Sequence, residues 1–108
     1  IAEFTEISVN ELKSRFDNGD ILIIDVRTEN EFIQGHLPTA KNIPLSKLSK
    51  DSSSIDKYKN KEVYLICAVG GRSGNAQRIL SSRGFLHTIN VTGGTKEWVA
   101  SNYPLEKE

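Results

Sequence analysis

The sequence lacks methionine altogether and has one cysteine, Cys67, among its 108 residues. A lone cysteine cannot form a disulfide within the chain, so the fold is not a disulfide scaffold, and a redox cycle that needs a second, resolving cysteine is excluded. No metal site is expected either, because neither His36 nor His87 lies at ligand spacing from Cys67. Cys67 is therefore either a small buried hydrophobic residue or a reactive thiol.

An excess of charge of one sign and long apolar runs are also missing. The 14 basic and 14 acidic residues balance to a net charge of zero, whereas nucleic acids and anionic membranes attract proteins with a basic excess. No apolar run approaches the ~20 residues of a membrane-spanning helix, and the first residues do not resemble a signal peptide. We therefore expect no nucleic-acid partner and no membrane partner.

The length of the chain predicts one domain covering residues 1–108, since the sequence shows neither an internal repeat nor a linker. The chain begins at Ile1 rather than at a methionine, so we expect a fragment, a processed form or a trimmed chain. We expect it to act in the cytoplasm. A periplasmic or exported location is the alternative, because a removed export signal would leave the same N-terminus.

Short apolar runs rich in β-branched residues alternate with amphipathic stretches. Residues 21–26, 62–66 and 88–91 are predicted to be buried strands, and shorter strands are predicted near residues 6–7 and 41–43. Runs that are apolar on both faces are typical of parallel strands covered by helices on both sides. The alternation of such strands with helical patterns predicts the α/β class.

Two segments carry the side chains of a capping box, in which a hydroxyl and a carboxylate satisfy free N–H groups of the first helical turn. Ser8 with Glu11 predicts one helix, for which we expect Gly19 to supply a left-handed ending, and Thr28 with Glu31 predicts another. Further along, residues 73–83 present one apolar helical face that Gly84 closes. Thr95 is predicted to cap the last helix, and residues 46–61 are predicted to be an exposed connection with short helical turns.

Cys67 directly follows the predicted strand at residues 62–66, and a short loop leads from it into a helix. Ligands of open parallel sheets bind at the carboxyl ends of the strands, which is where this cysteine lies. The loop residues that we expect to bind substrate are Ala68, Val69, Gly70, Gly71, Arg72 and Ser73. The position of Cys67 thus favours the reactive thiol over the buried filler.

Each part of this loop has a feature that would lower the pKa of the thiol or bind an anion. A helix N-terminus and nearby cations lower the pKa of a thiol, and a loop that curls over Cys67 would direct backbone N–H groups towards an anion. Gly70 and Gly71 are expected to allow the positive φ angles of such a loop. Arg72 adds a forked cation suited to an oxyanion, and Ser73 is placed to cap the helix and to donate a hydrogen bond inward.

Four segments, in this order along the chain, resemble signature segments of the rhodanese family. They are Asp25-Val26-Arg27 with Glu31, Gly35-His36-Leu37-Pro38-Thr39-Ala40 with Asn42-Ile43-Pro44, Cys67-Ala68-Val69-Gly70-Gly71-Arg72-Ser73, and Gly93-Gly94 with Trp98. The chain departs from the family at Leu37, where isoleucine is usual, and at Thr39, where glycine is usual. Together the segments span nearly the whole chain, which makes the resemblance more specific than any one motif.

The resemblance implies a three-layer fold with a central, mainly parallel five-stranded sheet flanked by helices on both faces. It also implies a sulfurtransferase that needs no cofactor and no metal and carries sulfur as a persulfide on Cys67. The donor would be a small sulfur-containing anion, thiosulfate or polysulfide, and the acceptor a thiol, a protein cysteine or, in an assay, cyanide. We expect a monomer or a weak homodimer.

Asp25, Arg27, Glu31 and His36 are polar residues of these segments, and the resemblance implies that they support the site structurally. Asp25 ends a buried strand, so its carboxylate must be paired or hydrogen-bonded. Arg27 and Glu31 lie four residues apart and are expected to form an ion pair. His36 is not expected to act as a base, because a thiolate activated by the loop needs none. Trp98 is expected in the core, with its indole N–H bound to a loop carbonyl.

Two other functions remain open. A phosphatase or arsenate reductase of the related cell-cycle phosphatase type has a longer loop, with five residues between cysteine and arginine, whereas four residues separate Cys67 from Arg72. The smaller loop favours a sulfur atom over a tetrahedral phosphate. A non-catalytic rhodanese-like binding or relay module is the other alternative; such modules often lack the cysteine that this chain retains.

Overall fold

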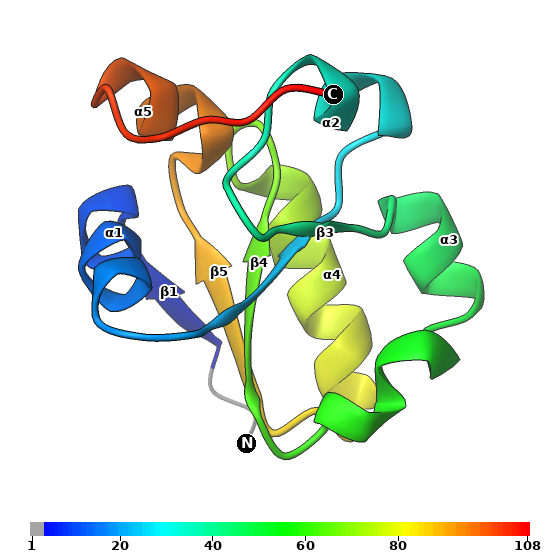
Figure 1. The fold of residues 1–108 in the computed structure, drawn as a ribbon. Helices are drawn as coiled ribbons and strands as arrows, with labels where there is room; N and C mark the ends of the chain where they lie inside the picture. Colours follow the sequence, from blue (N-terminus) through cyan, green and yellow to red (C-terminus); the bar gives the residue numbers. More distant parts are fainter. Residues whose placement is uncertain (1–3) are drawn as a thin grey trace.

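The computed structural model describes residues 4–108, and its core is one five-stranded sheet. The strands lie in the order β1-β5-β4-β2-β3, and every neighbouring pair is parallel (Figure 1). The strands are β1 (Thr5–Ile7), β2 (Leu22–Asp25), β3 (Lys41–Asn42), β4 (Glu62–Ile66) and β5 (His87–Val91). The predicted α/β class and the parallel five-stranded sheet are both confirmed.

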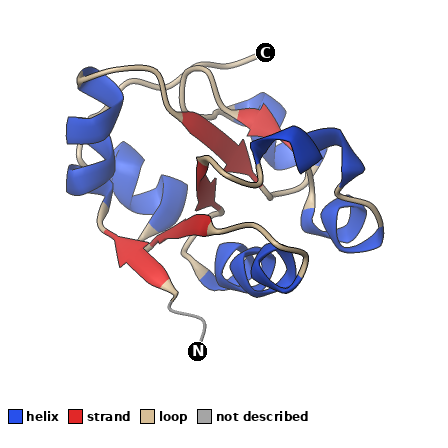
Figure 2. Cartoon of the chain, turned by 90° about the horizontal axis from the view of Figure 1, so that it is seen from below, coloured by secondary structure: helices blue, strands red, loops and turns tan. Residues whose placement is uncertain are grey.

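Helices cover both faces of the sheet, so the molecule has three layers (Figures 1 and 2). One face carries α1 (Val9–Asp17) and α5 (Gly94–Ala100), and the other carries α3 (Leu45–Lys50), the 3₁₀-helix η1 (Ser53–Tyr58) and α4 (Gly71–Ser82). The short helix α2 (Glu29–Gln34) buries none of its residues and lies beyond the carboxyl ends of the strands. None of the helices within residues 4–108 combines the length and apolar character needed to cross a membrane.

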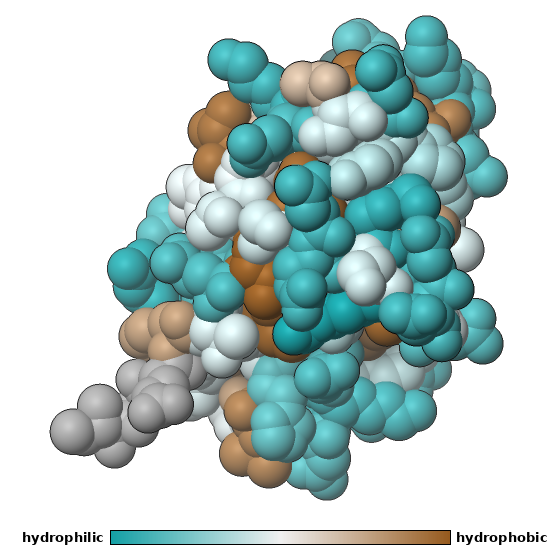
Figure 3. Space-filling view, turned by 90° about the vertical axis from the view of Figure 1, so that its left-hand side faces the viewer, coloured by the Kyte–Doolittle hydropathy of each residue, from teal (hydrophilic) through white to brown (hydrophobic). Residues whose placement is uncertain are grey.

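The strands alternate their side chains between two apolar clusters, which is why their sequences are apolar throughout. Ile23 and Tyr64 pack on the side of α1 and α5 around Trp98, which is fully buried. Ile24 and Leu65 pack on the opposite side, against α4. The surface over α1 and α5 is mainly hydrophilic, with small apolar groups between the polar side chains (Figure 3).

The beginnings of α1 and α2 follow the sequence closely, while the end of α1 does not. Thr28 and Glu31 form the complete capping box, and Ser8 accepts a hydrogen bond from the Glu11 N–H. The Glu11 carboxylate binds Arg15 instead of closing the second half of its box. The predicted left-handed ending at Gly19 is wrong, because the helix already ends at Asp17 with the next residue in right-handed geometry.

The second half of the chain contains one further correction at a helix start. Helix α4 ends at Ser82, and Gly84 has a φ of 94°, as its predicted closing role requires. Thr95, however, lies inside α5, whose N-cap is Gly93. The segment 46–61 is more regular than expected, since α3 and η1 occupy most of it and bury Leu48 and Ile55 in the α4 cluster.

Candidate active site

Strands β2 and β4 are neighbours, so the loops that follow them begin side by side. Asp25 is paired in register with Ile66, and the Val26 N–H donates to the Ile66 carbonyl at 3.0 Å. Cys67 is the next residue after β4, and only 1% of it is exposed. The sheet therefore brings the cysteine to the polar residues that follow β2.

The loop after Cys67 curls back over its sulfur. The Gly70 N–H donates to Cys67 Sγ at 3.0 Å, and Gly70 has a φ of 106°, a conformation that glycine adopts at little cost. Gly70 is also the N-cap of α4, so the predicted capping role of Ser73 is wrong. The expectation of a positive φ holds for Gly70 and fails for Gly71, which is already the first residue of the helix.

Ser73 instead points inward from the first turn of α4. Its Oγ lies 3.4 Å from Cys67 Sγ, 2.5 Å from Asn90 Oδ1 and 3.2 Å from the Gly70 carbonyl oxygen. Asn90, on β5, is buried, and its Nδ2 donates to the same Gly70 carbonyl at 3.3 Å. The inward hydrogen bond predicted for Ser73 is present.

The surroundings of Cys67 favour its ionised form. Burial raises the pKa of the thiol, but hydrogen bonds from Ser73 and from the backbone N–H groups of Gly70 and Val69 lower it, and the net pKa lies below the ordinary value of cysteine. The Arg72 guanidinium adds a favourable charge interaction with the thiolate. A larger share of Cys67 is therefore a nucleophilic thiolate near neutral pH than of a free cysteine.

The N-terminus of α5 holds the same loop from the other side. The Thr95 N–H donates to the Cys67 carbonyl at 2.8 Å, and the Lys96 N–H donates to the Ala68 carbonyl at 3.1 Å. Gly94 makes this approach possible, because a Cβ there would lie 2.3 Å from the Cys67 oxygen. With these carbonyls turned towards α5, the N–H groups of the loop face the sulfur.

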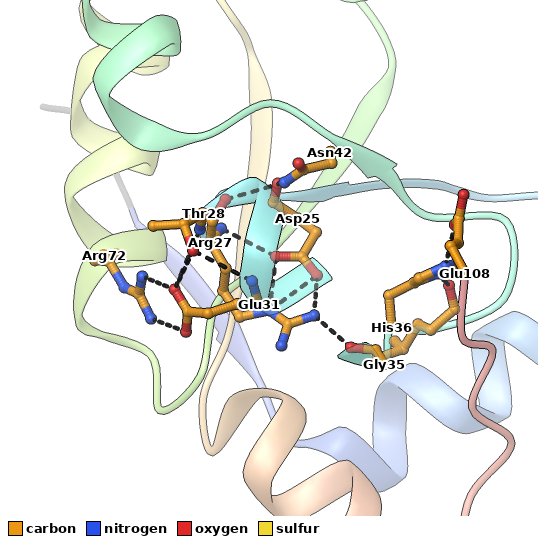
Figure 4. A network of polar contacts seen from close by, with 10 residues as sticks. Asp25, Arg27, Thr28, Glu31, Gly35, His36, Asn42, Arg72 and Glu108 are labelled. Carbon is orange, nitrogen blue, oxygen red and sulfur yellow. Dashed lines mark hydrogen bonds and ion pairs between the residues drawn. The ribbon is translucent and has the colours of Figure 1, made fainter. Parts of the chain in front are cut away.

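Asp25 and Arg27 form a buried pair beside the loop (Figure 4). Arg27 Nη2 lies 2.7 Å from Asp25 Oδ2 and also donates to the Gly35 carbonyl at 2.8 Å. The carboxylate of Asp25 is thus paired, as its burial requires. This pair ties the loop after β2 to the end of α2.

The ion pair predicted between Arg27 and Glu31 is wrong, because Glu31 binds Arg72 instead (Figure 4). The two Glu31 oxygens accept from Arg72 Nη1 at 2.6 Å and from Nη2 at 2.9 Å. This pairing, with help from Thr28, lowers the pKa of Glu31 to about 2. Arg72 therefore presents its charge to the loop while two of its five N–H donors are engaged by α2.

His36 lies apart from the sulfur, in contact with the end of the chain. Its Nε2 is 2.6 Å from Glu108 Oε2 (Figure 4). Its Nδ1 is 2.9 Å from the Leu37 carbonyl oxygen, and its ring stacks on Phe32. Trp98 Nε1 donates to the Pro104 carbonyl at 2.7 Å, which confirms the predicted loop contact. Both rings therefore attach the C-terminal segment to the body of the domain.

An open cleft of about 440 Å³ is lined by residues of α2 and α5, among them Thr95 and Lys96, whose N–H groups bind the loop carbonyls. Arg27, Glu31 and Lys96 give it charge, and Val99 and Leu105 give it an apolar side. Val69, at the rim of the loop, is 63% exposed and lines a separate hollow together with Lys96 and Glu97.

The geometry described above has a match among known proteins. The model of the rhodanese-like domain family matches residues 8–101. The chain belongs to this family. This rhodanese-like chain is 32% identical over 101 residues to a protein of Allochromatium vinosum named "Sulfurtransferase", with 93% of the chain and 92% of the relative covered.

A solved structure and a second relative extend the comparison. The rhodanese-like domain protein from Staphylococcus aureus superposes with a TM-score of 0.84 at 32% identity and covers 97% of this chain and 99% of that one. The Bacillus subtilis protein named "Putative sulfur carrier protein YrkF" is 36% identical over 94 residues, which are 86% of this chain. The chain spans 50% of the length of that relative.

Two contributors to the site were missed in the sequence. Asn90 is a polar residue within a buried strand, and that position was a usable signal, because a buried polar side chain needs a partner. The contribution of the N–H groups at the start of α5 was harder to predict from the sequence. Gly93 and Gly94 were noted as part of a motif, but their sequence alone does not show which carbonyls come close.

Proposed function

We propose that this rhodanese-like chain is a sulfurtransferase that moves sulfane sulfur from thiosulfate or a related donor to a thiol or cyanide through a persulfide on Cys67. The observation that carries the proposal is the loop geometry. Gly70 aims its N–H at the sulfur at 3.0 Å, and Ser73 lies beside it. Relatives named as a sulfurtransferase and as a sulfur carrier support the same reading.

The first step is an attack by the Cys67 thiolate on the outer sulfur of thiosulfate. A sulfur–sulfur bond forms to Cys67 as the bond between the two thiosulfate sulfurs breaks, and sulfite leaves with the bonding electron pair. The product on the protein is a persulfide anion. The loop N–H groups that lower the pKa of Cys67 also stabilise this negative charge.

The second step returns the site to its starting state. A nucleophile, either a thiolate or cyanide, attacks the outer persulfide sulfur, and the Cys67 thiolate leaves. With cyanide the product is thiocyanate. A low thiol pKa makes Cys67 a good leaving group, so the same hydrogen bonds favour both halves of the cycle.

Arg72 serves this chemistry by its charge and by the N–H donors that Glu31 leaves free. The natural acceptor in this proposal is a thiol or a protein cysteine. Neither role needs a metal or an organic cofactor.

The proposal is tested by intact-mass measurement after incubation with thiosulfate. We expect a gain of one sulfur atom, reversal of that gain by cyanide with formation of thiocyanate, and no gain in the Cys67→Ser variant. A wild-type chain that gains no sulfur from either thiosulfate or polysulfide would contradict the proposal and favour the binding-module alternative.

A further inference from the structure

The hydroxyl of Ser73 has one proton and three acceptors around it. The Asn90 Oδ1 is 2.5 Å away, the Gly70 carbonyl oxygen 3.2 Å and the Cys67 sulfur 3.4 Å. Ser73 is fully buried, and Cys67 and Asn90 are 1% and 4% exposed. The hydroxyl has a single proton, so a hydrogen bond donated to one of these acceptors is lost to the other two. Because little solvent reaches the group, water does not supply the missing donor.

The contacts of Asn90 fix which end of its amide faces Ser73. Its Nδ2 lies 3.3 Å from the Gly70 carbonyl oxygen and 3.4 Å from Glu6 Oε2. A carbonyl oxygen can only accept a hydrogen bond, so the amide nitrogen must face Gly70. The amide oxygen is therefore the atom that faces Ser73, and it accepts the hydroxyl proton over the shortest of the three distances.

The thiol and the thiolate of Cys67 make opposite demands on this hydroxyl. When Ser73 donates to Asn90, its oxygen is free to accept the S–H of the thiol. When Cys67 becomes a thiolate or a persulfide, the sulfur side needs a donor instead. The hydroxyl supplies one by rotating about its Cβ–Oγ bond, which breaks the hydrogen bond to Asn90 and transfers no proton between residues.

We propose that Asn90 is a positioning residue that competes with the Cys67 sulfur for the Ser73 hydroxyl proton. Asn90 holds Ser73 as an acceptor while Cys67 is protonated, and negative charge on the sulfur turns Ser73 into a donor. The catalytic meaning of this competition rests on the proposed function, because a persulfide is the anion that the turned hydroxyl would stabilise.

Other charged groups face Cys67 and must be held constant in a test. They come from several elements: Glu6 on β1, reached through Asn90; the Asp25–Arg27 pair after β2; Glu31 on α2, bound to Arg72 on α4; and Lys96 and Glu97 at the start of α5. Substitution of Asn90 also removes the hydrogen bonds from its Nδ2 to Glu6 and to the Gly70 carbonyl. That loss is the same whether residue 73 is Ser or Ala, so the difference between the two backgrounds reports on the hydroxyl.

The test is a double-mutant cycle with Asn90→Ala and Ser73→Ala, read by the ultraviolet absorbance of the thiolate as a function of pH, with the signal of Cys67→Ser subtracted. Asn90→Ala frees the hydroxyl to donate to sulfur. At a pH on the acid side of the wild-type midpoint, we expect about a fivefold larger thiolate fraction, the size of one net hydrogen bond. Ser73→Ala should lower that fraction.

The deciding measurement is Asn90→Ala in the Ser73→Ala background, where we expect no change in the thiolate midpoint. A residue that acted only by supporting the fold would shift the midpoint equally in both backgrounds. An equal shift, or an unchanged or raised midpoint in the single variant Asn90→Ala, would overturn the proposal. Asn90→Val fills the buried volume with a residue that favours strands and should give the same result if Asn90→Ala folds poorly.

Thiolate absorbance does not depend on sulfur transfer, so the two proposals fail separately. A chain that gains no sulfur from thiosulfate but shows the coupled titration would contradict the proposed function and leave the competition for the Ser73 proton intact. A chain that gains sulfur but shows no coupling between Asn90 and Ser73 would support the proposed function and contradict the competition for the Ser73 proton.

Discussion

Helices α4 and α5 begin in nearly the same way, yet the N–H groups at their starts face different partners. Each follows a strand of the sheet at its carboxyl end, and each has a glycine N-cap with a positive φ, 106° at Gly70 and 82° at Gly93. At α4 the loop N–H groups face the Cys67 sulfur. At α5 they bind the carbonyls of Cys67 and Ala68.

The difference teaches how a reactive loop is held in shape. Helices α1 and α2 begin with a side-chain cap from Ser8 and Thr28, whereas neither α4 nor α5 has one. The N–H groups left uncapped at α4 are available to an anion, and those at α5 fix the peptide groups that aim them. The start of α4 directs N–H groups at the Cys67 sulfur, and the start of α5 holds the loop in that orientation.

The largest expected effect is at Gly94, where the two loops meet. A Cβ there would lie 2.3 Å from the Cys67 oxygen and 2.4 Å from the Ala68 oxygen, both of them backbone atoms, and φ is 57°. We expect Gly94→Ala to lower the free energy of unfolding by about 2–4 kcal/mol, measured by urea denaturation. The matched control is Gly71→Ala, whose Cβ meets nothing within 4 Å.

That control should change the free energy of unfolding by less than about 1 kcal/mol in either direction. A loss in Gly94→Ala no larger than in Gly71→Ala would show that α5 can retreat from the loop freely. The conclusion that the start of α5 holds the loop in place would then be wrong.

A smaller effect is expected at Gly70, on the α4 side. A Cβ there would meet only ordinary contacts, the nearest at 3.6 Å, so Gly70→Ala introduces strain at φ 106° and no clash. Rotation of the peptide to relieve that strain would turn the Gly70 N–H away from the sulfur.

We expect Gly70→Ala to raise the pKa of Cys67 and to reduce the thiolate fraction about tenfold on the acid side of the midpoint, since hydrogen bonds to charged groups are the stronger class. Thiolate absorbance measures this directly, with Gly71→Ala as the neighbouring control. A thiolate titration identical to that of the wild type would show that the Gly70 N–H is not needed to stabilise the anion.

The smallest effect concerns a left-handed position that has no glycine. The Ala40 N–H donates to the Leu37 carbonyl and closes a turn in which Thr39 has a φ of 68°. β-branched residues adopt this conformation at a cost. We expect Thr39→Gly to stabilise the domain by about 1 kcal/mol in urea denaturation without changing the thiolate titration. A destabilised variant would mean that contacts of the threonine side chain outweigh its backbone strain.

Local patterns predicted the fold and the position of Cys67 well. The apolar runs predicted the strands, and the hydroxyl of Thr28 predicted the start of a helix. The end of a strand predicted where Cys67 lies in the fold. The errors fall where a distant partner decides. Glu31 binds Arg72 across the site rather than its near neighbour Arg27, and the start of α5 packs against backbone atoms that are far away in the sequence.

Thr39 shows the same limit in another form. Its departure from the family's glycine was visible in the sequence, but its positive φ was not. Asn90 likewise stood out only as a polar residue in a strand. Its partners come from the loop, α4 and β1, which the sequence does not place next to one another.

The hydrogen bonds from α5 to the loop also make the loop depend on a part of the chain that is distant in sequence. Strand β5 and helix α5 are the last regular elements of the chain, so the carbonyls of Cys67 and Ala68 gain their partners only when this part has docked. Until then the loop has nothing to turn its N–H groups inward, and Cys67 has the modest reactivity of a free thiol. The reactivity of Cys67 is thereby expected to depend on an element that lies more than 25 residues beyond it in the sequence.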